Sequence, residues 1–167
     1  MAKKKLEILK ALDKLGKAAG LKSLAAEANL SVGEVLGNVR GLVSNDYVKK
    51  SQRSYLITDK GRTALKVLSP TLPDKAFKFY EGIDQYTGVL AKSLEDFLVK
   101  IKGVDSKVLE FHTSRGDFEN WVLGVFGDKQ LASKLGELRP KGLEGEELRS
   151  EVSKAFNERY RAFQSLS

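Results

Sequence analysis

The one histidine of the chain, His112, lies close in sequence to Arg115, Asp117 and Trp121. If one helix ran through this stretch, His112 and Arg115 would share a face, and Asp117 could orient either side chain. Such a set could bind a ligand or a partner, or transfer a proton. The simpler interpretation is structural, because residues 114–116 resemble a turn between two helices. In that interpretation Arg115 pairs with Asp117, and Asp117 caps the next helix.

Other catalytic chemistry has little support in the sequence. The chain has no cysteine, which excludes disulfides, thiol catalysis and cysteine-bound metals. It also has no phosphate-binding glycine loop, dinucleotide-binding motif or nucleophile elbow. We therefore expect a protein that is not an enzyme, with no metal and no cofactor.

The charge is distributed unevenly along the 167 residues. Residues 1–68 hold 14 Lys or Arg and 6 Asp or Glu, whereas the remaining 99 residues hold 15 and 16. Two prolines in 69–73 mark the change in composition. We predict a basic domain over 1–68, a linker over 69–75 and a second domain over 76–167. Such asymmetry indicates that the first domain meets a polyanion.

Periodicity predicts the elements of the basic domain. Apolar residues recur at helical spacing in three stretches, and a fourth helix follows a run with a period of two. The predicted order is a helix over 3–19, a helix over 21–28, a helix from Ser31 to about Asn45, a hairpin over 47–57 and a helix over 59–68. Ser31 and Glu34 have the spacing of a capping box at the start of the third helix.

The third helix should have an apolar side and a polar side. Val32, Val35, Leu36, Val39, Leu42 and Val43 are expected to be buried, and Glu34, Asn38, Asn45, Gly37 and Gly41 to face outward, with Gly33, Arg40 and Ser44 between the two sides. Gly33, Gly37 and Gly41 form a strip that favours close approach of a sugar-phosphate strand or another helix. The alternative, that these glycines relieve crowding inside the domain, is equally supported.

Several of these residues are candidates for nucleic-acid contact. Those expected to hold phosphates are Lys22, Ser23, Lys49, Lys50 and Arg53, and Ser31 is a further candidate for nucleic-acid contact. Asn38, Arg40 and Asn45 have side chains that can read base edges. Because these three are few, direct base recognition is expected to be limited.

The order of elements and the stretch Tyr55-Leu56-Ile57-Thr58-Asp59-Lys60-Gly61-Arg62-Thr63-Ala64-Leu65 resemble the winged helix-turn-helix of bacterial and archaeal regulators. The resemblance covers residues 5–68. It implies that the third helix enters the major groove of DNA and that the hairpin, the wing, touches phosphates or the minor groove.

The second domain is predicted to be mostly helical. Residues 76–80 and 86–90 alternate like two strands of a hairpin, although a short helix would also fit. Helices are expected after caps at Ser93, Asp105, Asp117 and Asp128, followed by a last helix over 146–163.

Residues 76–163 also resemble a small archaeal domain of unknown function that occurs beside glycogen-metabolism and glycoside-hydrolase proteins. The motifs that carry this resemblance are Tyr86-Thr87-Gly88, Ser93-Leu94, Glu110-Phe111-His112, Arg115-Gly116-Asp117-Phe118-Glu119-Asn120-Trp121, Gly127-Asp128, Leu131-Ala132 and Arg159. The resemblance implies an archaeal origin and no established activity, and it leaves carbohydrate or metabolite sensing as an analogy.

The sequence thus predicts a mainly α protein: a winged helix-turn-helix with a β-hairpin wing and a mostly helical second domain for homodimerisation or partner contact. The expected function is binding of double-stranded DNA, as a transcriptional regulator or a broad-specificity chromosome-associated protein. The alternatives are a factor that binds structured RNA or the ribosome, and a protein-interaction adaptor. No apolar run could span a bilayer and no export signal is evident, so a cytoplasmic location without a membrane partner is expected.

Overall fold

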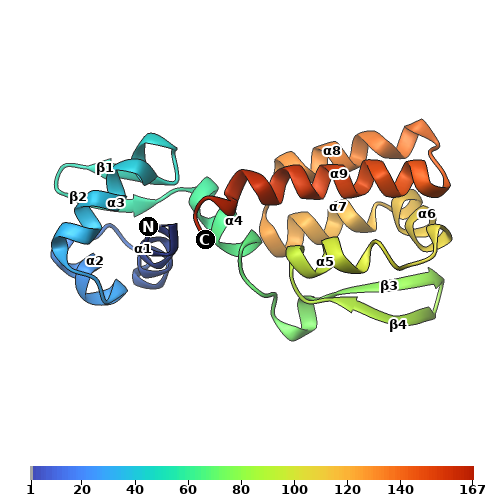
Figure 1. The fold of residues 1–167 in the computed structure, drawn as a ribbon, viewed down its shortest axis with the longest axis horizontal. Helices are drawn as coiled ribbons and strands as arrows, with labels where there is room; N and C mark the ends of the chain where they lie inside the picture. The colour runs from blue at the N-terminus through green and yellow to red at the C-terminus, as the bar shows by residue number, and fades with distance from the viewer. Residues whose placement is uncertain (1) are drawn as a thin grey trace. The chain divides into compact units, whose positions relative to one another are not determined.

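The computed structural model describes residues 2–167, which form mainly helices and two small antiparallel hairpins (Figure 1). The predicted class, mainly α with a β-hairpin, is therefore confirmed. The chain divides into two compact units. Unit 1 comprises the residues up to Leu65 together with Phe163–Ser167, and unit 2 comprises Lys66–Ala162.

Unit 1 consists of three helices and a hairpin, and a further helix extends from it into unit 2. The elements are α1 (Ala2–Leu15), α2 (Leu21–Ala28), α3 (Val32–Ser44), β1 (Val48–Ser51), β2 (Ser54–Ile57) and α4 (Asp59–Val67). The helices pack through buried aliphatic side chains, and α1 contacts both α2 and α3. The sequence places residues 163–167 in the second domain, but in the structure the Phe163 ring lies 6.1 Å from that of Tyr47, centroid to centroid, within unit 1.

Helix α3 begins where predicted, but the side of the helix that is buried is rotated relative to the predicted side. The Glu34 N–H donates to Ser31 Oγ, and the Ser31 N–H donates to the Glu34 carboxylate, which completes the capping box. The buried residues of α3 are Val35, Asn38, Val39 and Leu42, whereas Val32 and Leu36 are exposed. The buried stripe follows the i, i+3, i+4, i+7 spacing of one helix face, and position 38 falls within it. The prediction that Asn38 faces outward is therefore wrong.

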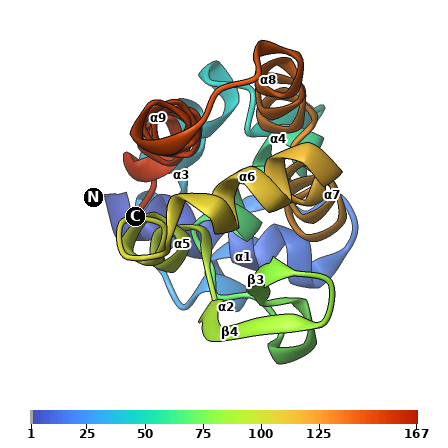
Figure 2. The same ribbon diagram turned by 90° about the vertical axis from the view of Figure 1, so that its right-hand side faces the viewer.

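Unit 2 has a hairpin on one side, helices α5 to α7 in the middle and α8 and α9 on the other side (Figures 1 and 2). The elements are η1 (Pro73–Lys75), β3 (Phe77–Gly82), β4 (Gln85–Ala91), α5 (Leu94–Lys100), α6 (Ser106–Arg115), α7 (Asp117–Trp121), a π-helical turn η2 (Val122–Phe126), α8 (Lys129–Leu138), η3 (Arg139–Lys141) and α9 (Gly145–Gln164). The hairpin predicted near residues 76–90 is thus present, in place of the alternative short helix.

Aromatic rings form the centre of unit 2. Phe77 and Phe79 of β3 contact Phe97 of α5, and Phe97 stacks on Phe156 of α9 with ring centroids 4.2 Å apart. These rings are buried, and their mutual packing fixes the hairpin on the helices.

Three of the four predicted caps in unit 2 are confirmed. The side chains of Ser93, Asp105 and Asp128 each accept a backbone N–H at the start of a helix. The prediction for Asp117 is wrong, because Gly116 is the cap residue of α7. Gly116 has a φ of +72°, a left-handed conformation that glycine adopts without strain. Asp117 is the first residue of α7, and its carboxylate is used elsewhere.

Candidate functional site

The hairpin of unit 1 exposes the cations that the sequence singled out. Lys49 and Lys50 lie on β1, and Arg53 follows the turn residue Gln52, whose φ is +54°. All three cations are exposed. Within residues 2–167 none of them forms an ion pair with a carboxylate.

A backbone bridge brings a second basic segment to the same hairpin. The Ala19 N–H donates to the Tyr55 carbonyl at 2.9 Å, and the Tyr55 N–H donates to the Ala19 carbonyl at 2.8 Å. A side chain added at Gly20 would lie 3.7 Å from the Arg53 carbonyl. Lys17, Lys22 and Ser23, which flank this bridge, are therefore neighbours of the hairpin. Sequence reasoning missed Lys17, because a single bridged residue leaves no periodic signal.

Four other cations of unit 1 have carboxylate partners among the described residues. Lys4 pairs with Glu34 at 2.9 Å, Lys14 pairs with Glu27 at 2.5 Å, and Lys10 pairs with Glu7. Arg62 lies near Asp13 and Asp59. By contrast, Lys22, Arg40, Lys49, Lys50 and Arg53 form no ion pair with any carboxylate in the described chain. Positive charge without a carboxylate partner in the described chain therefore lies around the hairpin, the start of α2 and α3, and also at Lys3, Lys5 and Lys17.

The residues expected to read bases are mostly engaged within α3 itself. Asn38 Nδ2 donates to the Glu34 carbonyl at 2.7 Å, and Asn38 is only 6% exposed. Asn45 Nδ2 donates to the Gly41 carbonyl at 2.8 Å. Arg40 remains as the exposed candidate with an uncommitted side chain. The Ser31 hydroxyl already serves the capping box.

The glycine strip of α3 divides into two parts. A methyl group added at Gly37 would have no neighbour within 4 Å, and one added at Gly33 would reach just the Ser31 hydroxyl, at 4.0 Å. At Gly41 it would lie 3.5 Å from Lys5 Nζ of α1. Crowding therefore does not account for Gly33 and Gly37, which lie on an open surface with the exposed side chains of Val32 and Leu36.

The capping residue Glu34 is also tied to α1. A hydrogen bond from Lys4, together with bonds to the Ser31 backbone and side chain, lowers the pKa of Glu34 to about 2. The carboxylate therefore stays charged over the whole neutral and mildly acidic range.

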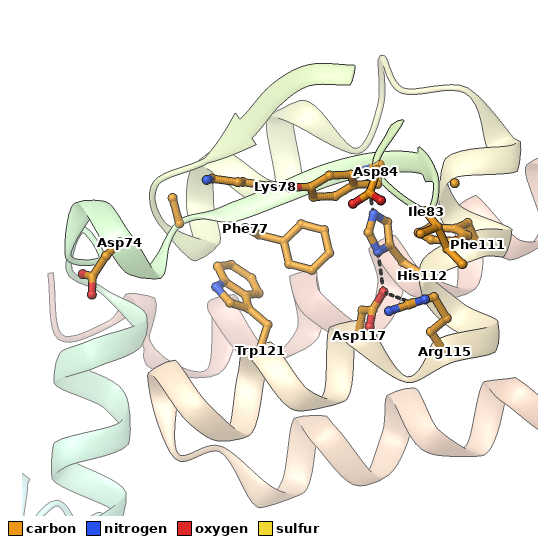
Figure 3. Close-up of a pocket in the computed structure, with 13 residues that line it drawn as sticks. Asp74, Phe77, Lys78, Ile83, Asp84, Phe111, His112, Arg115, Asp117 and Trp121 are labelled. Carbon is orange, nitrogen blue, oxygen red and sulfur yellow. Dashed lines mark hydrogen bonds and ion pairs between the residues drawn. The ribbon is translucent and has the colours of Figure 1, made fainter. Parts of the chain in front are cut away.

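The structure brings four residues of the predicted site to one groove of unit 2: His112, Arg115, Asp117 and Trp121 (Figure 3). The backbone N–H of Tyr80 donates to His112 Nε2 at 2.9 Å, so this nitrogen carries no proton. His112 Nδ1 is consequently protonated and donates to Asp117 Oδ2 at 2.8 Å. Arg115 Nε donates to the same oxygen at 3.2 Å, and the Arg115 guanidinium lies over the Phe111 ring.

This arrangement is that of a positioning histidine. Burial lowers the pKa of His112 below its ordinary value, against the opposing effect of Asp117, so the ring is neutral at pH 7. Both ring nitrogens are committed, and neither is available to take a proton from a substrate. His112 and Trp121, whose Nε1 donates to the Lys75 carbonyl at 2.8 Å, fasten the segment that contains β3 to α6 and α7. Beside them lies a groove of about 490 Å³.

No cluster of three or more potential metal ligands occurs among residues 2–167. Nor does any helix in that range have the length and apolar character needed to cross a bilayer. Comparison with protein-family models, curated proteins and solved structures gave no match to the chain. The function is therefore argued from the chain's own geometry.

Proposed function

We propose that the chain is a DNA-binding winged-helix protein, in which α3 and the hairpin β1–β2 of unit 1 contact the duplex. The observation that carries the proposal is a group of exposed cations around the hairpin and α3 that form no ion pair among the described residues: Lys22, Arg40, Lys49, Lys50 and Arg53. Phosphates supply the anions that such a surface lacks, and release of their counterions favours binding. The bridge between Ala19 and Tyr55 supports the assignment of the hairpin as a wing fixed to the helices.

In the proposed binding mode, unit 1 contacts mainly the sugar-phosphate backbone of the duplex and makes few contacts with base edges. Asn38 and Asn45 donate to carbonyls of their own helix, which leaves Arg40 as the main base-reading candidate on α3. The exposed small and apolar residues of α3 allow close approach and add no base-specific hydrogen bonds. These features favour a broad-specificity chromosome-associated protein over a regulator of individual promoters.

Duplex is favoured over single-stranded nucleic acid. Single strands are commonly held by exposed aromatic rings on which bases stack. The aromatic residues of unit 1 are Tyr47, Tyr55 and Phe163, and all three are buried. Structured RNA presents the same phosphates and is therefore the second candidate, to be separated by experiment.

The test is a binding titration with the full chain. Fluorescence anisotropy would follow a labelled 20-base-pair DNA duplex and a labelled RNA stem-loop over a range of salt concentrations. Replacing Lys49 and Arg53 together by alanine should weaken DNA binding roughly tenfold and reduce the slope of log K against log salt by about 2, since two phosphate contacts are lost.

The matched control is the double variant Lys102→Ala/Lys107→Ala, which removes two exposed, unpaired lysines from unit 2. Its affinity and salt slope should equal those of the native chain. If the hairpin variant also behaves like the native chain, the wing assignment is wrong. Crosslinking in native cells then distinguishes the classes: continuous genomic coverage supports a chromosome protein, discrete promoter peaks a regulator, and ribosomal RNA the second candidate.

A further inference from the structure

The groove of unit 2 runs between a strand and two helices (Figure 3). Strand β3 and the turns at its two ends form one wall. The opposite wall is formed by α6 and α7, through Phe111, His112, Arg115, Asp117 and Trp121. The volume of about 490 Å³ is within the range of sites that hold ligands.

The wall formed by β3 is a strand edge. Within residues 2–167, β3 pairs with β4 and with no other strand. The Tyr80 N–H points away from β4, because it donates to His112 Nε2. The Phe79 carbonyl points the other way, since it accepts from Thr87 Oγ1 of β4 at 2.8 Å.

Backbone groups alternate between the two edges of an antiparallel strand, so the N–H and C=O of Lys78 face the same side as the Tyr80 N–H. No hydrogen bond on that side uses the Lys78 backbone in the described chain. The pairing moves from Lys78↔Leu90 to Tyr80↔Tyr86, two residues along β3 but four along β4. The extra residues of this shift therefore belong to β4, and β3 stays regular from Phe77 to Tyr80. A second shift, between Tyr80 and Gly82, places one extra residue in β3 beyond that point.

The side chains around this edge indicate what kind of segment would fit. Ile83, in the turn after β3, lines the groove and is 73% exposed, which is a large exposure for an isoleucine. Asp74 and Asp84 also line it, are exposed, and form no ion pair among the described residues. Arg115 and Asp117 neutralise each other. The uncompensated carboxylates thus lie before and after β3. Among the described residues that line the groove, Lys78 is the one cation without a carboxylate partner.

We propose that this groove binds an extended, basic segment of a partner protein, which adds as a strand to the open edge of β3. The main chain of the segment pairs with the N–H and C=O of Lys78. An apolar side chain of the segment covers Ile83, and lysine or arginine side chains lie near Asp74 and Asp84. His112 and Trp121 hold the edge in place for this pairing and do not contact the added main chain through their committed nitrogens. The proposal does not depend on nucleic-acid binding by unit 1.

The test uses a phage-displayed library of random 12-residue peptides, selected on the full chain. An enriched peptide is then synthesised and titrated calorimetrically against the native chain, Lys78→Ala and Lys78→Pro. Proline removes the outward N–H and blocks strand addition, whereas alanine removes the side chain and keeps the backbone. We expect Lys78→Pro to weaken binding at least tenfold and Lys78→Ala to change it by less than about threefold.

Proline at position 78 should be tolerated, because the N–H that it removes makes no bond to β4. Circular dichroism and the unfolding temperature would check that the variant is folded. If Lys78→Pro does not fold, a peptide methylated at successive backbone nitrogens supplies the same test on the native chain. Methylation at the residue paired with Lys78 should then abolish binding, and equal binding of all methylated peptides would overturn the proposal.

The contribution of the two carboxylates to peptide binding is tested with the double variant Asp74→Asn/Asp84→Asn. This variant should bind the selected basic peptide several-fold more weakly, and the difference should shrink at high salt. The matched control, Glu137→Gln/Glu147→Gln, removes two exposed carboxylates elsewhere in unit 2 and should bind normally.

Three further results would overturn the proposal. They are the absence of any enriched peptide, equal binding to Lys78→Pro and Lys78→Ala, and self-association in sedimentation velocity that Lys78→Pro abolishes. The last result would assign the edge to a second copy of the chain. Peptide binding without any nucleic-acid binding would refute the proposed function and leave this inference standing.

Discussion

The two hairpins described in the structure are both two-stranded and antiparallel, but their surroundings differ. The hairpin β1–β2 is joined to unit 1 by a backbone bridge from Ala19 to Tyr55, and it directs Lys49, Lys50 and Arg53 to solvent. The hairpin β3–β4 is joined to the helices of unit 2 by buried rings and by the bond from the Tyr80 N–H to His112, and Trp121 donates to Lys75 just before β3.

The two hairpins differ in how the charged side chains around them are paired. Around β1–β2 the cations have no carboxylate partners, so their charge is available to a polyanion. Around β3 the charged side chains of Arg115 and Asp117 pair with each other, and what stays available is a strand edge with Asp74 and Asp84 near its two ends. The role proposed for each hairpin therefore depends on which of its charged side chains and backbone groups have no partner in the described chain.

The largest effect is expected when the His112 side chain is removed, which tests how far the stability of the hairpin β3–β4 depends on it. His112→Ala removes the acceptor of the Tyr80 N–H and a donor to Asp117, and it leaves a cavity among aromatic rings. We expect a loss of about 3 kcal/mol in the free energy of unfolding. Urea denaturation would measure it, with Lys107→Ala on the exposed side of the same helix as control. A loss below about 1 kcal/mol would contradict the positioning role.

Acid should affect the two units in different pH ranges. The folded pKa of His112 lies below its ordinary value of 6.5, so the unfolded chain binds this proton first as the pH falls. The stability that neutral His112 provides is full above about pH 6.5 and decreases below it, by at most about 1.4 kcal/mol per pH unit. Glu34 contributes above its ordinary value of 4.5, and this contribution is lost as the pH falls towards about 2.

Denaturation at a series of pH values would measure both ranges. His112→Asn should abolish the decrease that begins near pH 6.5, and Glu34→Gln should abolish the one below pH 4.5. An unchanged profile between pH 7 and 5 in His112→Asn would show that other groups cause the decrease there.

A smaller effect is expected for Arg40 on α3. Arg40 is the main base-reading candidate on α3, but in backbone-directed binding it acts chiefly through its charge near phosphates. Arg40→Ala should therefore weaken binding to all duplexes by a similar factor of about three to five. Selection from a randomised duplex library, done with the native chain and with the variant, would measure it. A sequence motif that is enriched by the native chain and lost in Arg40→Ala would contradict backbone-directed binding.

The smallest effect concerns the glycine strip. Gly37→Ala should raise the free energy of unfolding by about 0.5–1 kcal/mol, because alanine favours helix and no neighbour lies within 4 Å. If the bare surface of α3 approaches the duplex, the same change should weaken DNA binding a few-fold. Gly136→Ala in α8 is the control, with a similar gain in stability and no change in binding. Equal DNA binding by both variants would assign the strip no part in the interface.

Much of the secondary structure was predictable, since it depends on neighbours in sequence. The capping box of Ser31 and Glu34, the turn after Ser51 and the last helix over 145–164 follow from spacing and turn chemistry. The site was less predictable. The outward Asn38 is wrong, because position 38 lies in the buried stripe of α3, which is rotated relative to the predicted one. The cap at Asp117 is wrong, because Gly116 caps α7 and the Asp117 carboxylate accepts from His112. DNA binding and the winged-helix resemblance stay predictions.

The sequence by itself determined the segregation of positive charge into residues 1–68, the absence of cysteine chemistry and the order of helices and hairpins. Only the tertiary structure decided which charges are paired, which tautomer His112 adopts and which edge of β3 stays open. The reason is distance along the chain: Tyr80 meets His112 across 32 positions and Trp121 meets Lys75 across 46. Local propensities act over a few residues, whereas such contacts form when the whole unit packs.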